Sequence, residues 1–449
     1  MALTASEVKR KLLHIAVGGF ALLLRDLTWP EAAAMALLAF VFNWQVLPRV
    51  GGRRLWRDPE HAAGHPLGIL IYPLSVLGLV LAFRHDLWMA AAIWGVLALG
   101  DGMASIVGQA VGGPRLPWNP RKGWAGFSSF VICGAVAAAL LTAWTLHLPL
   151  GSWTSPRILG LAVPLAIACA LVESMPTALD DNLTVPIAGA CVLPLLAMAE
   201  PSLLVGDPGF AGRLAVGLAV NVVIAALAWR ARSIDGPGAV SAVVIGALIT
   251  TALGLAGLSR MGAFFVVGRG LTRVGYRVKA ARGIAQEKGG ARGWRNAWAN
   301  GGVAAALAVL AGMTEGGTRA LFVLAYAAAV ATAAADTGSS EIGKAYGRRT
   351  FLITTFRPVP PGTEGAVSLE GTMAGLAAAA ILGSIGAATG LYSWAWAPAI
   401  ALAGLLGSLA ESVLGTVAEK RGWLDNDLLN ALNTAIGAGI VTLMARVHA

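Results

Sequence analysis

The chain has 449 residues, of which 57% are hydrophobic and only 12% are charged, and its mean hydropathy is +0.71. Soluble domains carry roughly 25% charged residues, so a soluble fold of this size could not hide so much apolar surface. The net charge of +10 could favour nucleic acid or anionic lipid, but the distribution of the charges explains it without a nucleic-acid partner. The composition predicts an all-α polytopic membrane protein, because helices satisfy their own backbone groups in lipid.

Apolar runs long enough to form membrane helices recur along the whole chain. We expect about 15 transmembrane helices, at 12–24, 31–48, 66–83, 87–112, 125–147, 156–174, 183–199, 211–229, 237–255, 258–270, 297–313, 319–340, 366–390, 395–418 and 428–445. The run at 258–270 is short and is either longer or re-entrant.

The positive charges are distributed unevenly between the loops. If the N-terminus is cytoplasmic and the spans alternate, most of the 33 lysines and arginines are cytoplasmic, and the opposite side holds only Arg25, Arg84, Arg157, Arg213, Arg260, Arg319 and Arg446. Membrane proteins show this asymmetry because positive loops stay inside. We therefore expect a protein of the bacterial inner membrane or an equivalent membrane, with its polar motifs facing the cytoplasm.

Two halves of the chain carry the same motifs in the same order. The glycine- and proline-rich segment 199–212 marks a boundary, which predicts domains at 1–205 and 206–449. Each half has an Asp-x3-Ser-x2-Gly motif, then a Glu-Ser pair and an Asp-Asn pair. These motifs begin at Asp101, Glu173 and Asp181 in the first half and at Asp336, Glu411 and Asp425 in the second. The repetition predicts a duplicated catalytic unit.

The carboxylates of these motifs suit a metal ion. Carboxylates near membrane spans are costly unless they are paired or used, and Mg²⁺ is usually held by one or two carboxylates together with substrate phosphates. We expect metal ligands at Asp101, Asp181, Asp336 and Asp425, catalytic carboxylates at Asp101, Glu173, Asp336 and Glu411, and neutral oxygens from Asn182 and Asn426. The alternative is that the aspartates cap helices or bond neighbouring helices.

A basic loop that contains glycine follows each aspartate motif. Glycine lets backbone N–H groups approach phosphate oxygens, and lysine or arginine supplies charge. The nucleotide- or phosphate-binding candidates are Arg10, Lys11, His14, Ser105, Lys122 and Gly126 in the first half, and Ser340, Lys344, Arg357, Gly362, Thr363, Glu364 and Gly365 in the second. For any one of them, a membrane anchor or ordinary cytoplasmic charge is the alternative. The stretch 269–295 is the most basic, and indicates either a solvated or lipid-contacting loop or a site for a polyanion.

These motifs resemble two related kinase families. Arg10-Lys-Leu-Leu-His14, Gly100-Asp101, Ala104-Ser105, Lys122, Gly126 and the run from Glu173 to Pro186 resemble the dolichol kinase and phytol kinase family, over residues 6–200. Ala335-Asp-Thr-Gly-Ser-Ser-Glu341, Pro360-Pro-Gly-Thr-Glu-Gly365 and Leu406–Gly415 resemble the phytyl-phosphate kinase family, over residues 235–445. The second resemblance is the more specific, because Pro-Pro-Gly-Thr-Glu-Gly is a long and unusual run.

The resemblance implies a fused pair of kinases. The first half would phosphorylate an isoprenoid alcohol such as phytol or geranylgeraniol, and the second would phosphorylate the isoprenyl phosphate to the diphosphate. It also implies CTP as the phosphate donor and Mg²⁺ as the cofactor. The first half departs from the family pattern Lys-Ser-x-Glu-Gly-Ser, since Gly123, Ala125 and Phe127 replace its Ser, Glu and final Ser.

Two other functions fit part of the pattern. A transporter with two repeats would also carry charged residues in its spans, but it would place them near mid-bilayer rather than at helix ends. A cytidylyltransferase that makes a CDP-lipid would use the same metal and phosphate ligands, and it would release pyrophosphate rather than CDP.

Overall fold

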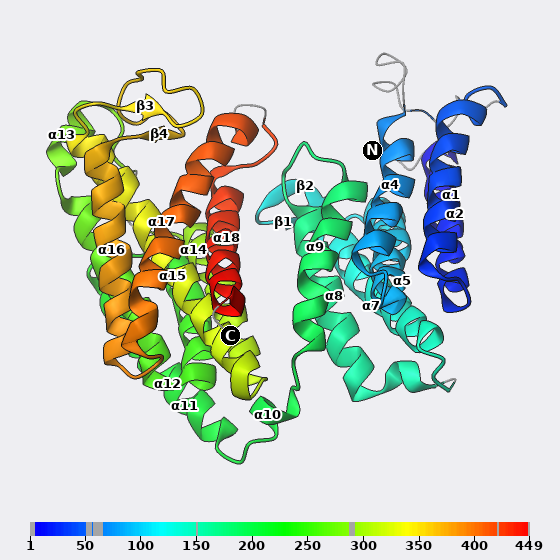
Figure 1. Ribbon diagram of the computed structural model, residues 1–449, viewed down its shortest axis with the longest axis horizontal. Coiled ribbons are helices and arrows are strands. Elements are labelled where there is room, and N and C mark those ends of the chain that lie inside the picture. The colour runs from blue at the N-terminus through cyan, green and yellow to red at the C-terminus, as the bar shows by residue number, and fades with distance from the viewer. Residues whose placement is uncertain are drawn as a thin grey trace. The chain divides into compact units, whose positions relative to one another are not determined.

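The structure is a computed structural model that describes residues 5–50, 56, 66–149, 151–286, 292–419 and 422–447. The described chain is mostly helical. It divides into two compact units, Met1–Met198 and Ala199–Ala449, and Figure 1 follows both along the chain.

The first unit consists of helices of very different lengths and one short hairpin. Its elements are α1 (Ala5–Gly18), η1 (Gly19–Arg25), α2 (Trp29–Val41), η2 (Phe42–Val46), α4 (Leu67–Ala82), α5 (Leu87–Gly95), η4 (Val96–Asp101), α6 (Gly102–Val111), β1 (Arg115–Leu116), β2 (Asn119–Gly123), α7 (Trp124–Thr145), η5 (Ser152–Thr154), α8 (Pro156–Ser174) and α9 (Asp181–Ala197).

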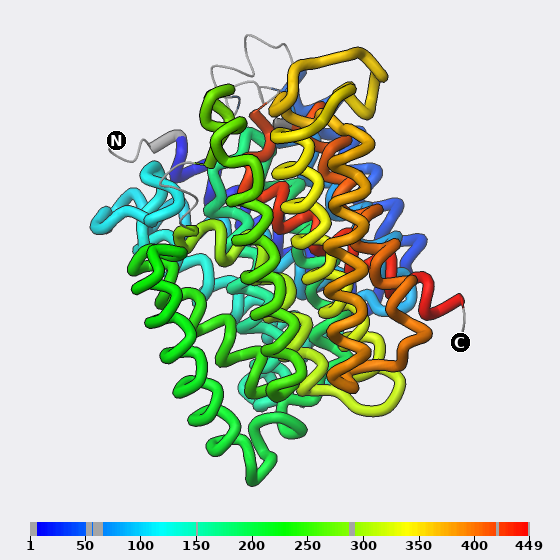
Figure 2. The backbone as a smooth tube through the Cα atoms, turned by 90° about the vertical axis from the view of Figure 1, so that its left-hand side faces the viewer, coloured from blue at the N-terminus to red at the C-terminus, as the bar shows by residue number. Residues whose placement is uncertain are grey.

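The second unit is a bundle whose helices run roughly parallel or antiparallel to one another (Figure 2). Its elements are α10 (Ser202–Val205), α11 (Phe210–Arg230), α12 (Gly236–Arg273), α13 (Tyr276–Ala281), α14 (Trp294–Gly312), α15 (Gly316–Tyr346), β3 (Phe351–Leu352), β4 (Ala366–Val367), α16 (Leu369–Ala388), η7 (Trp394–Trp396), α17 (Ala397–Leu414), η8 (Gly415–Glu419) and α18 (Asn426–Val447).

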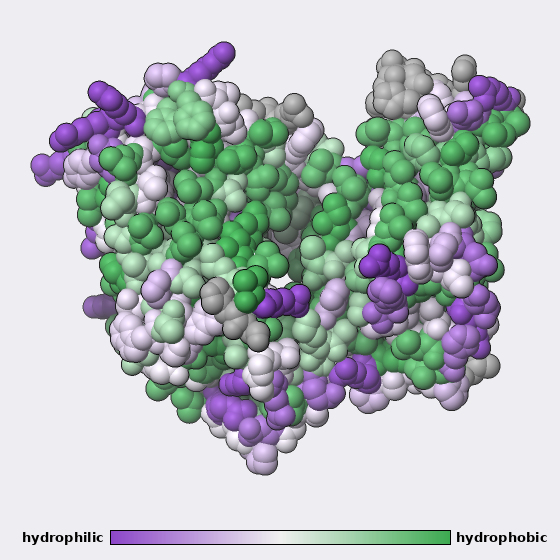
Figure 3. All heavy atoms as spheres, in the orientation of Figure 1, coloured by the Kyte–Doolittle hydropathy of each residue, from purple (hydrophilic) through white to green (hydrophobic). Residues whose placement is uncertain are grey.

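The helices have the length and composition of membrane spans. Among the described residues, nine helices are long and apolar enough to cross a bilayer, and Leu67–Ala82 and Asp181–Ala197 are shorter apolar helices. Figure 3 shows apolar side chains over much of each unit, with hydrophilic ones gathered toward the helix ends. The protein is therefore a polytopic helical membrane protein, although this criterion does not confirm the predicted count of about 15.

The run from α5 to α6 carries the first aspartate motif. Leu87–Val111 is one apolar segment of 25 residues, interrupted by the π-helical turn η4, which ends at Asp101. A π-turn shifts the register of the side chains that follow it, and such turns are frequent at functional sites. Here the turn places Asp101 in the interior, where the residue is only 4% exposed.

The hairpin of β1 and β2 joins α6 to α7. Leu116 pairs with Asn119 and Arg115 with Gly123, in antiparallel register. The hairpin projects Lys122 toward the ends of α8 and α9, where two of the motif carboxylates lie.

Helix α12 folds back on itself. A straight helix would separate Gly238 from Gly268 by about 45 Å. Yet a Cβ atom at Gly238 would lie 2.6 Å from the backbone oxygen of Arg292, and one at Gly268 would lie 2.8 Å from the guanidinium Nη2 of the same arginine. The chain reverses at Gly254, whose φ of 66° and ψ of −163° are not helical. The two arms correspond to the predicted spans 237–255 and 258–270.

Arg260, which the predicted topology assigns to the opposite side at the start of the span 258–270, is buried in the second arm of α12 and is 0% exposed. Its guanidinium donates hydrogen bonds to the carbonyl groups of Leu382 and Ala327 and to the Tyr392 hydroxyl. These bonds tie α12 to α15 and α16.

Because the chain reverses at Gly254, we expect the stability of the protein to be sensitive to substitution of this glycine. Positive φ combined with ψ near 180° is a region that essentially only glycine occupies, and another residue there costs about 1–3 kcal/mol. We expect Gly254→Ala to lower the free energy of unfolding by about this amount, measured as a lower thermal unfolding temperature of the full chain in detergent. Gly262→Ala is the matched control, because Gly262 lies in the same helix with nothing near its Cβ position. Equal stability of the two variants would contradict the reversal.

Candidate functional site

Three carboxylates of the first unit meet at one place. One oxygen atom from each of Asp101, Glu173 and Asp181 lies within 4.8 Å of the other two. They come from η4, from the C-terminal end of α8 and from the first residue of α9. The fold therefore brings together three residues that the sequence separates by up to eighty positions.

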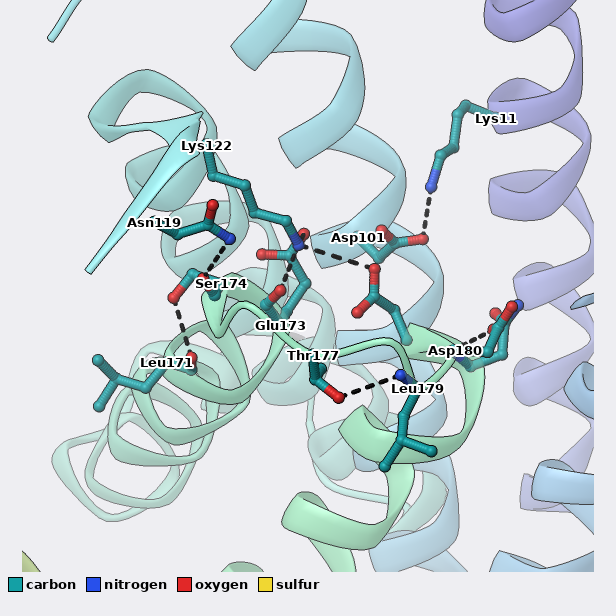
Figure 4. A network of polar contacts seen from close by, with 12 residues as sticks. Lys11, Asp101, Asn119, Lys122, Leu171, Glu173, Ser174, Thr177, Leu179 and Asp180 are labelled. Carbon is teal, nitrogen blue, oxygen red and sulfur yellow. Dashed lines mark hydrogen bonds and ion pairs between the residues drawn. The ribbon is translucent and has the colours of Figure 1, made fainter. Parts of the chain in front are cut away.

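Two lysines hold this cluster together. Lys11 Nζ of α1 donates to Asp101 Oδ2 at 2.7 Å, and Lys122 Nζ of β2 donates to Glu173 Oε1 at 2.7 Å (Figure 4). Lys122 Nζ also lies 3.8 Å from Asp181 Oδ2. Burial opposes the charged form of Lys122, but the carboxylates of Glu173 and Asp181 outweigh it and raise the pKa of Lys122 above its usual value. Lys122 therefore stays charged at neutral pH.

Local hydrogen bonds fix the ends of α8 and α9. Asn119 Nδ2 donates to the Ser174 carbonyl at 3.0 Å, and Trp118 Nε1 donates to Ser174 Oγ at 3.0 Å, which pins the hairpin to the residue after Glu173. At the start of α9, the Asn182 N–H donates to Asp180 Oδ1 at 2.9 Å. An aspartate in this position satisfies a free N–H group of the first turn. Asp180 is thus the helix cap, and this leaves the neighbouring Asp181 for the cluster.

A small polar cavity lies on one side of the carboxylates. Its volume is about 240 Å³, and it is lined by Glu7, Arg10, Lys11, Asp101, Ser105, Ile106, Gln109, Lys122, Glu173 and Asp181. The structure thus places four sequence-predicted phosphate- or nucleotide-site residues of the first half beside the carboxylates: Arg10, Lys11, Ser105 and Lys122. We call this space the polar cavity.

A larger and more apolar cavity lies on the other side. Its volume is about 540 Å³, and its walls come from α1, from η2 and the residue after it, from α4, from Asp101 and from residues 178–182 at the start of α9. Arg10, Lys11, Asp101 and Asp181 line both cavities. We call the larger space the apolar cavity, and the shared residues form the wall between the two.

His14 and Asn182 line the apolar cavity and not the polar one. His14 Nε2 lies 3.2 Å from the Leu97 carbonyl oxygen and 3.5 Å from Asp101 Oδ2. Asn182 Nδ2 donates to the Gly68 carbonyl at 3.3 Å. The structure therefore places both side chains on the wall of the apolar cavity, and their part in nucleotide binding stays a prediction.

The donor set of the cluster fits a divalent cation. Among the described residues that line the polar cavity, four carboxyl groups face three cationic side chains, so the carboxyl groups outnumber the cations by one. An anionic triphosphate would be repelled there unless a cation neutralised the carboxylates. Mg²⁺ prefers carboxylate oxygens of this kind. Asp101, Glu173 and Asp181 are the residues that would hold it.

Two features of the first basic loop have structural roles. Gly126 is buried in α7, and a Cβ atom there would lie 3.0 Å from the Ala104 carbonyl oxygen of α6. It serves helix packing and lines neither cavity. Phe127, at a position where the related kinases carry serine, packs edge-to-face on Trp118 and Trp124 with ring centroids 5.9 and 5.8 Å away.

The motifs of the second unit line a smaller cavity of about 160 Å³. The predicted residues on its wall are Asp336, Ser340, Lys344, Gly362, Thr363, Glu364, Gly365, Glu411 and Asn426. They come from α15, the loop before β4, α17 and the start of α18. Gly365 has a φ of +71°, and a Cβ atom there would lie 2.6 Å from the Ser412 carbonyl oxygen. Only glycine therefore lets this loop close over α17.

Two predicted residues of the second half lie away from this cavity. Asp425 pairs with Arg295 at 3.2 Å and accepts a hydrogen bond from the Leu428 N–H, so it caps α18. Arg357 is exposed in the turn after β3. Among the described residues, the structure forms no second cluster of three carboxylates, so the predicted set of Asp336, Glu411 and Asp425 is wrong as a shared metal site.

The basic stretch 269–295 contains a buried ion pair that the sequence analysis missed. Lys279 of α13 pairs with Glu341 of α15, and both side chains are at most 2% exposed. Lys279 Nζ also donates to the Thr272 carbonyl at 2.9 Å. Part of the stretch is therefore neither solvated nor lipid-contacting, although residues 287–291 lie outside the described residues. A lysine in a basic run carries no sequence signal of such burial.

Comparison with known proteins identifies the family. A sequence model of the integral membrane protein family DUF92 matches residues 219–438. An uncharacterized membrane protein of Synechocystis is 43% identical over 198 residues, which cover 44% of this chain and 77% of that protein. The chain belongs to the DUF92 family of integral membrane proteins. The family model matches the chain once, within the second predicted half, so the predicted fusion of two kinase halves is not shown.

Two further relatives of this DUF92 protein come from plants. Protein VTE6 of Arabidopsis thaliana is 39% identical over 216 residues, which cover 47% of this chain and 65% of that protein. Probable phytol kinase 2 of Glycine max is 30% identical over 203 residues, which cover 43% of this chain and 67% of that protein. No solved structure matches the chain.

The carboxylate cluster predicts metal binding that can be measured without any activity. We expect the full-length protein in detergent to bind Mn²⁺, a paramagnetic substitute for Mg²⁺, and Asp181→Asn to weaken the tightest site about tenfold or more, because affinity follows the number of ligand charges. Electron paramagnetic resonance of free Mn²⁺ reports the affinity. Asp207→Asn is the control, since Asp207 pairs with Arg213 at the surface of the second unit. Unchanged affinity of Asp181→Asn would contradict the cluster as a metal site.

Proposed function

We propose that this DUF92 protein phosphorylates a long-chain isoprenoid alcohol in two steps, with CTP as the donor and Mg²⁺ as the cofactor. The first unit would make the isoprenyl monophosphate and the second unit the diphosphate. The active sites would face the cytoplasm, where CTP is available. The proposal joins the motif resemblance with the relatives named phytol kinase.

One observation carries the first step. Two carboxylates of the cluster, Asp101 and Asp181, lie with Lys11 on the wall between a polar and a more apolar cavity, and Glu173 and Lys122 line the polar side. A kinase that acts on a membrane alcohol must bring a water-soluble triphosphate and a lipid to one point. The polar cavity suits the triphosphate, since Lys11 and Lys122 can neutralise phosphate oxygens. Catalysis of phosphoryl transfer is mainly positioning and charge stabilisation, which is what this wall provides.

The proposed transfer forms one phosphorus–oxygen bond and breaks another. The oxygen of the alcohol attacks the γ-phosphorus of CTP, the bond from that phosphorus to the β–γ bridging oxygen breaks, and CDP leaves. The hydroxyl proton passes to Asp101, because this carboxylate faces both cavities. When bound, Mg²⁺ would supply charge to the phosphate oxygens, and Glu173 and Asp181 with Asp101 would hold it. Lys122 would remain charged and stabilise the charge that develops during transfer.

The second step is supported by the cavity of the second unit. Asp336, Lys344 and Glu411 place both signs of charge on its wall, and the Gly362–Gly365 loop offers backbone N–H groups near it. Loops of this kind bind phosphate through the backbone. The acceptor would be a monophosphate oxygen, which becomes the bridging oxygen of the diphosphate as CDP is released.

The two steps predict two separable variants. In vesicles that contain the purified full-length protein, CTP and Mg²⁺, we expect Asp101→Asn to reduce formation of isoprenyl phosphate from phytol or geranylgeraniol about 100-fold. It should leave conversion of supplied phytyl phosphate to the diphosphate intact. Asp336→Asn should do the reverse. Thin-layer chromatography of the labelled lipids checks both.

Three results would contradict this assignment. If both variants lose the same step, the two-site proposal fails. If pyrophosphate rather than CDP is released, the protein is a cytidylyltransferase. If the vesicles move a solute and neither lipid is phosphorylated, the transporter alternative is favoured.

A further inference from the structure

We infer that the apolar cavity of the first unit is the binding site of the acceptor alcohol, which reaches it sideways from the bilayer between η2 and α4, and that His14 binds its hydroxyl group. This inference rests on the proposed function, because it assigns one substrate of that reaction to a place. Neither the motifs nor the relatives indicate where the lipid binds.

The rim of the apolar cavity is apolar and exposed. Leu13 of α1, Phe42 of η2 and Leu67 of α4 all line the cavity, and each is about half exposed, at 47%, 47% and 52%. Large apolar side chains at an opening are unfavourable in water, and they suit contact with lipid chains. The rim therefore favours a hydrocarbon chain as the occupant, and not a soluble metabolite.

The deep end of the same cavity is polar and buried. Tyr72 is 8% exposed and Asp101 is 4% exposed. The Tyr72 hydroxyl accepts a hydrogen bond from Trp94 Nε1 at 2.8 Å, and the His14 ring packs edge-to-face on Tyr72 with ring centroids 4.7 Å apart. A chain that lies along the apolar walls would thus bring its polar end to the wall that faces the polar cavity.

His14 is the group best placed to bind that polar end. A carbonyl oxygen can only accept, so the contact of His14 Nε2 with the Leu97 carbonyl puts a proton on Nε2. The other nitrogen of the neutral ring, Nδ1, then accepts a hydrogen bond, which suits a hydroxyl donor. Asn182 lines the same cavity, and its Oδ1 atom is buried with no hydrogen-bond partner among the described residues. Either group can accept the single hydroxyl hydrogen bond of the bound alcohol before that proton passes to Asp101 during transfer, and neither offers a cation to a phosphate.

Photo-crosslinking of the full-length protein tests the site without requiring catalysis. The probe is a geranylgeraniol analogue with a diazirine at the tail, in phosphatidylethanolamine–phosphatidylglycerol vesicles without nucleotide. We expect labelled peptides from η2 and from the first turns of α4, and we expect excess geranylgeraniol to compete for this labelling. Helix α11, which is largely exposed, reports the background of contact with bulk lipid.

A matched pair of substitutions on α4 tests the route. Leu67 and Leu81 are 52% and 48% exposed on the same helix, and only Leu67 lines the cavity. We expect Leu67→Trp to abolish the competed labelling and to raise the KM for the alcohol about tenfold, with the KM for CTP unchanged. Leu81→Trp should change neither.

A second pair separates the alcohol from the nucleotide. His14→Phe keeps the ring and loses the nitrogens, so the KM for the alcohol should rise about tenfold, the value of one hydrogen bond. The KM for CTP should stay the same. Ser105→Ala, in the polar cavity, should raise the KM for CTP and leave that for the alcohol unchanged. A change of both constants together in His14→Phe would overturn its assigned role.

The outcomes also separate this inference from the proposed function. If geranylgeraniol competes for labelling at the cavity but the alcohol is not phosphorylated, the proposed alcohol site stands and the proposed kinase activity is wrong. Phosphorylation with labelling no higher than that of α11 keeps the kinase and overturns the alcohol site. Equal effects of Leu67→Trp and Leu81→Trp would overturn the route.

Discussion

The pairing of Asp101 with Lys11 is the interaction on which the first unit depends. A carboxylate within an apolar helical run is costly to bury unless a cation meets it. The cation comes from α1, ninety residues earlier in the chain, so α1 must dock against the run from α5 to α6. The same reasoning applies to Lys122 and Glu173, which tie the hairpin to the end of α8. The two ion pairs therefore bring α1 and the hairpin together at the site. They also supply its two lysines.

The two units use their buried charges differently. In the first, both lysines point at the motif carboxylates and leave them grouped around one point. In the second, the buried lysine Lys279 pairs with Glu341, which follows Asp336 by five residues and so lies on another face of α15. Asp425 is held by Arg295 and caps a helix. Similar motif order thus gives two different sites: a carboxylate cluster between two cavities, and a single small cavity closed by a glycine loop. Two successive acceptors of different charge would need such a difference, since an alcohol is neutral and its phosphate is not.

The first unit has two cavities of different polarity, one on each side of its carboxylate site. The polar cavity is lined mainly by charged residues, whereas the apolar cavity passes from exposed leucine and phenylalanine to partly buried histidine and to buried tyrosine and aspartate. A reaction between a lipid and a water-soluble donor needs a boundary between apolar and polar surroundings, because a charged triphosphate is costly to move into apolar surroundings. A long hydrocarbon chain is likewise unfavourable in water. In the proposed reaction, the wall that holds Asp101, Lys11 and Asp181 would be that boundary. It would also limit water, if the acceptor enters from the apolar side as inferred.

The sequence by itself determined the membrane helices, because a long apolar run has few other stable solutions. The predicted span 156–174 matches α8, and 87–112 differs from Leu87–Val111 by one residue. It also identified most residues that line the polar cavity, since charges in apolar surroundings are conspicuous. Only the tertiary structure decided which of them meet. The local sequence does not distinguish Asp181 from Asp425, since an asparagine follows each. Yet Asp181 joins the carboxylate cluster, whereas Asp425 pairs with Arg295, 130 residues away in the chain. Gly126 likewise looks like a phosphate-loop glycine until α6 is packed against it. Such choices depend on contacts between helices distant in the chain, where long-range geometry and the need to pair buried charge outweigh local pattern.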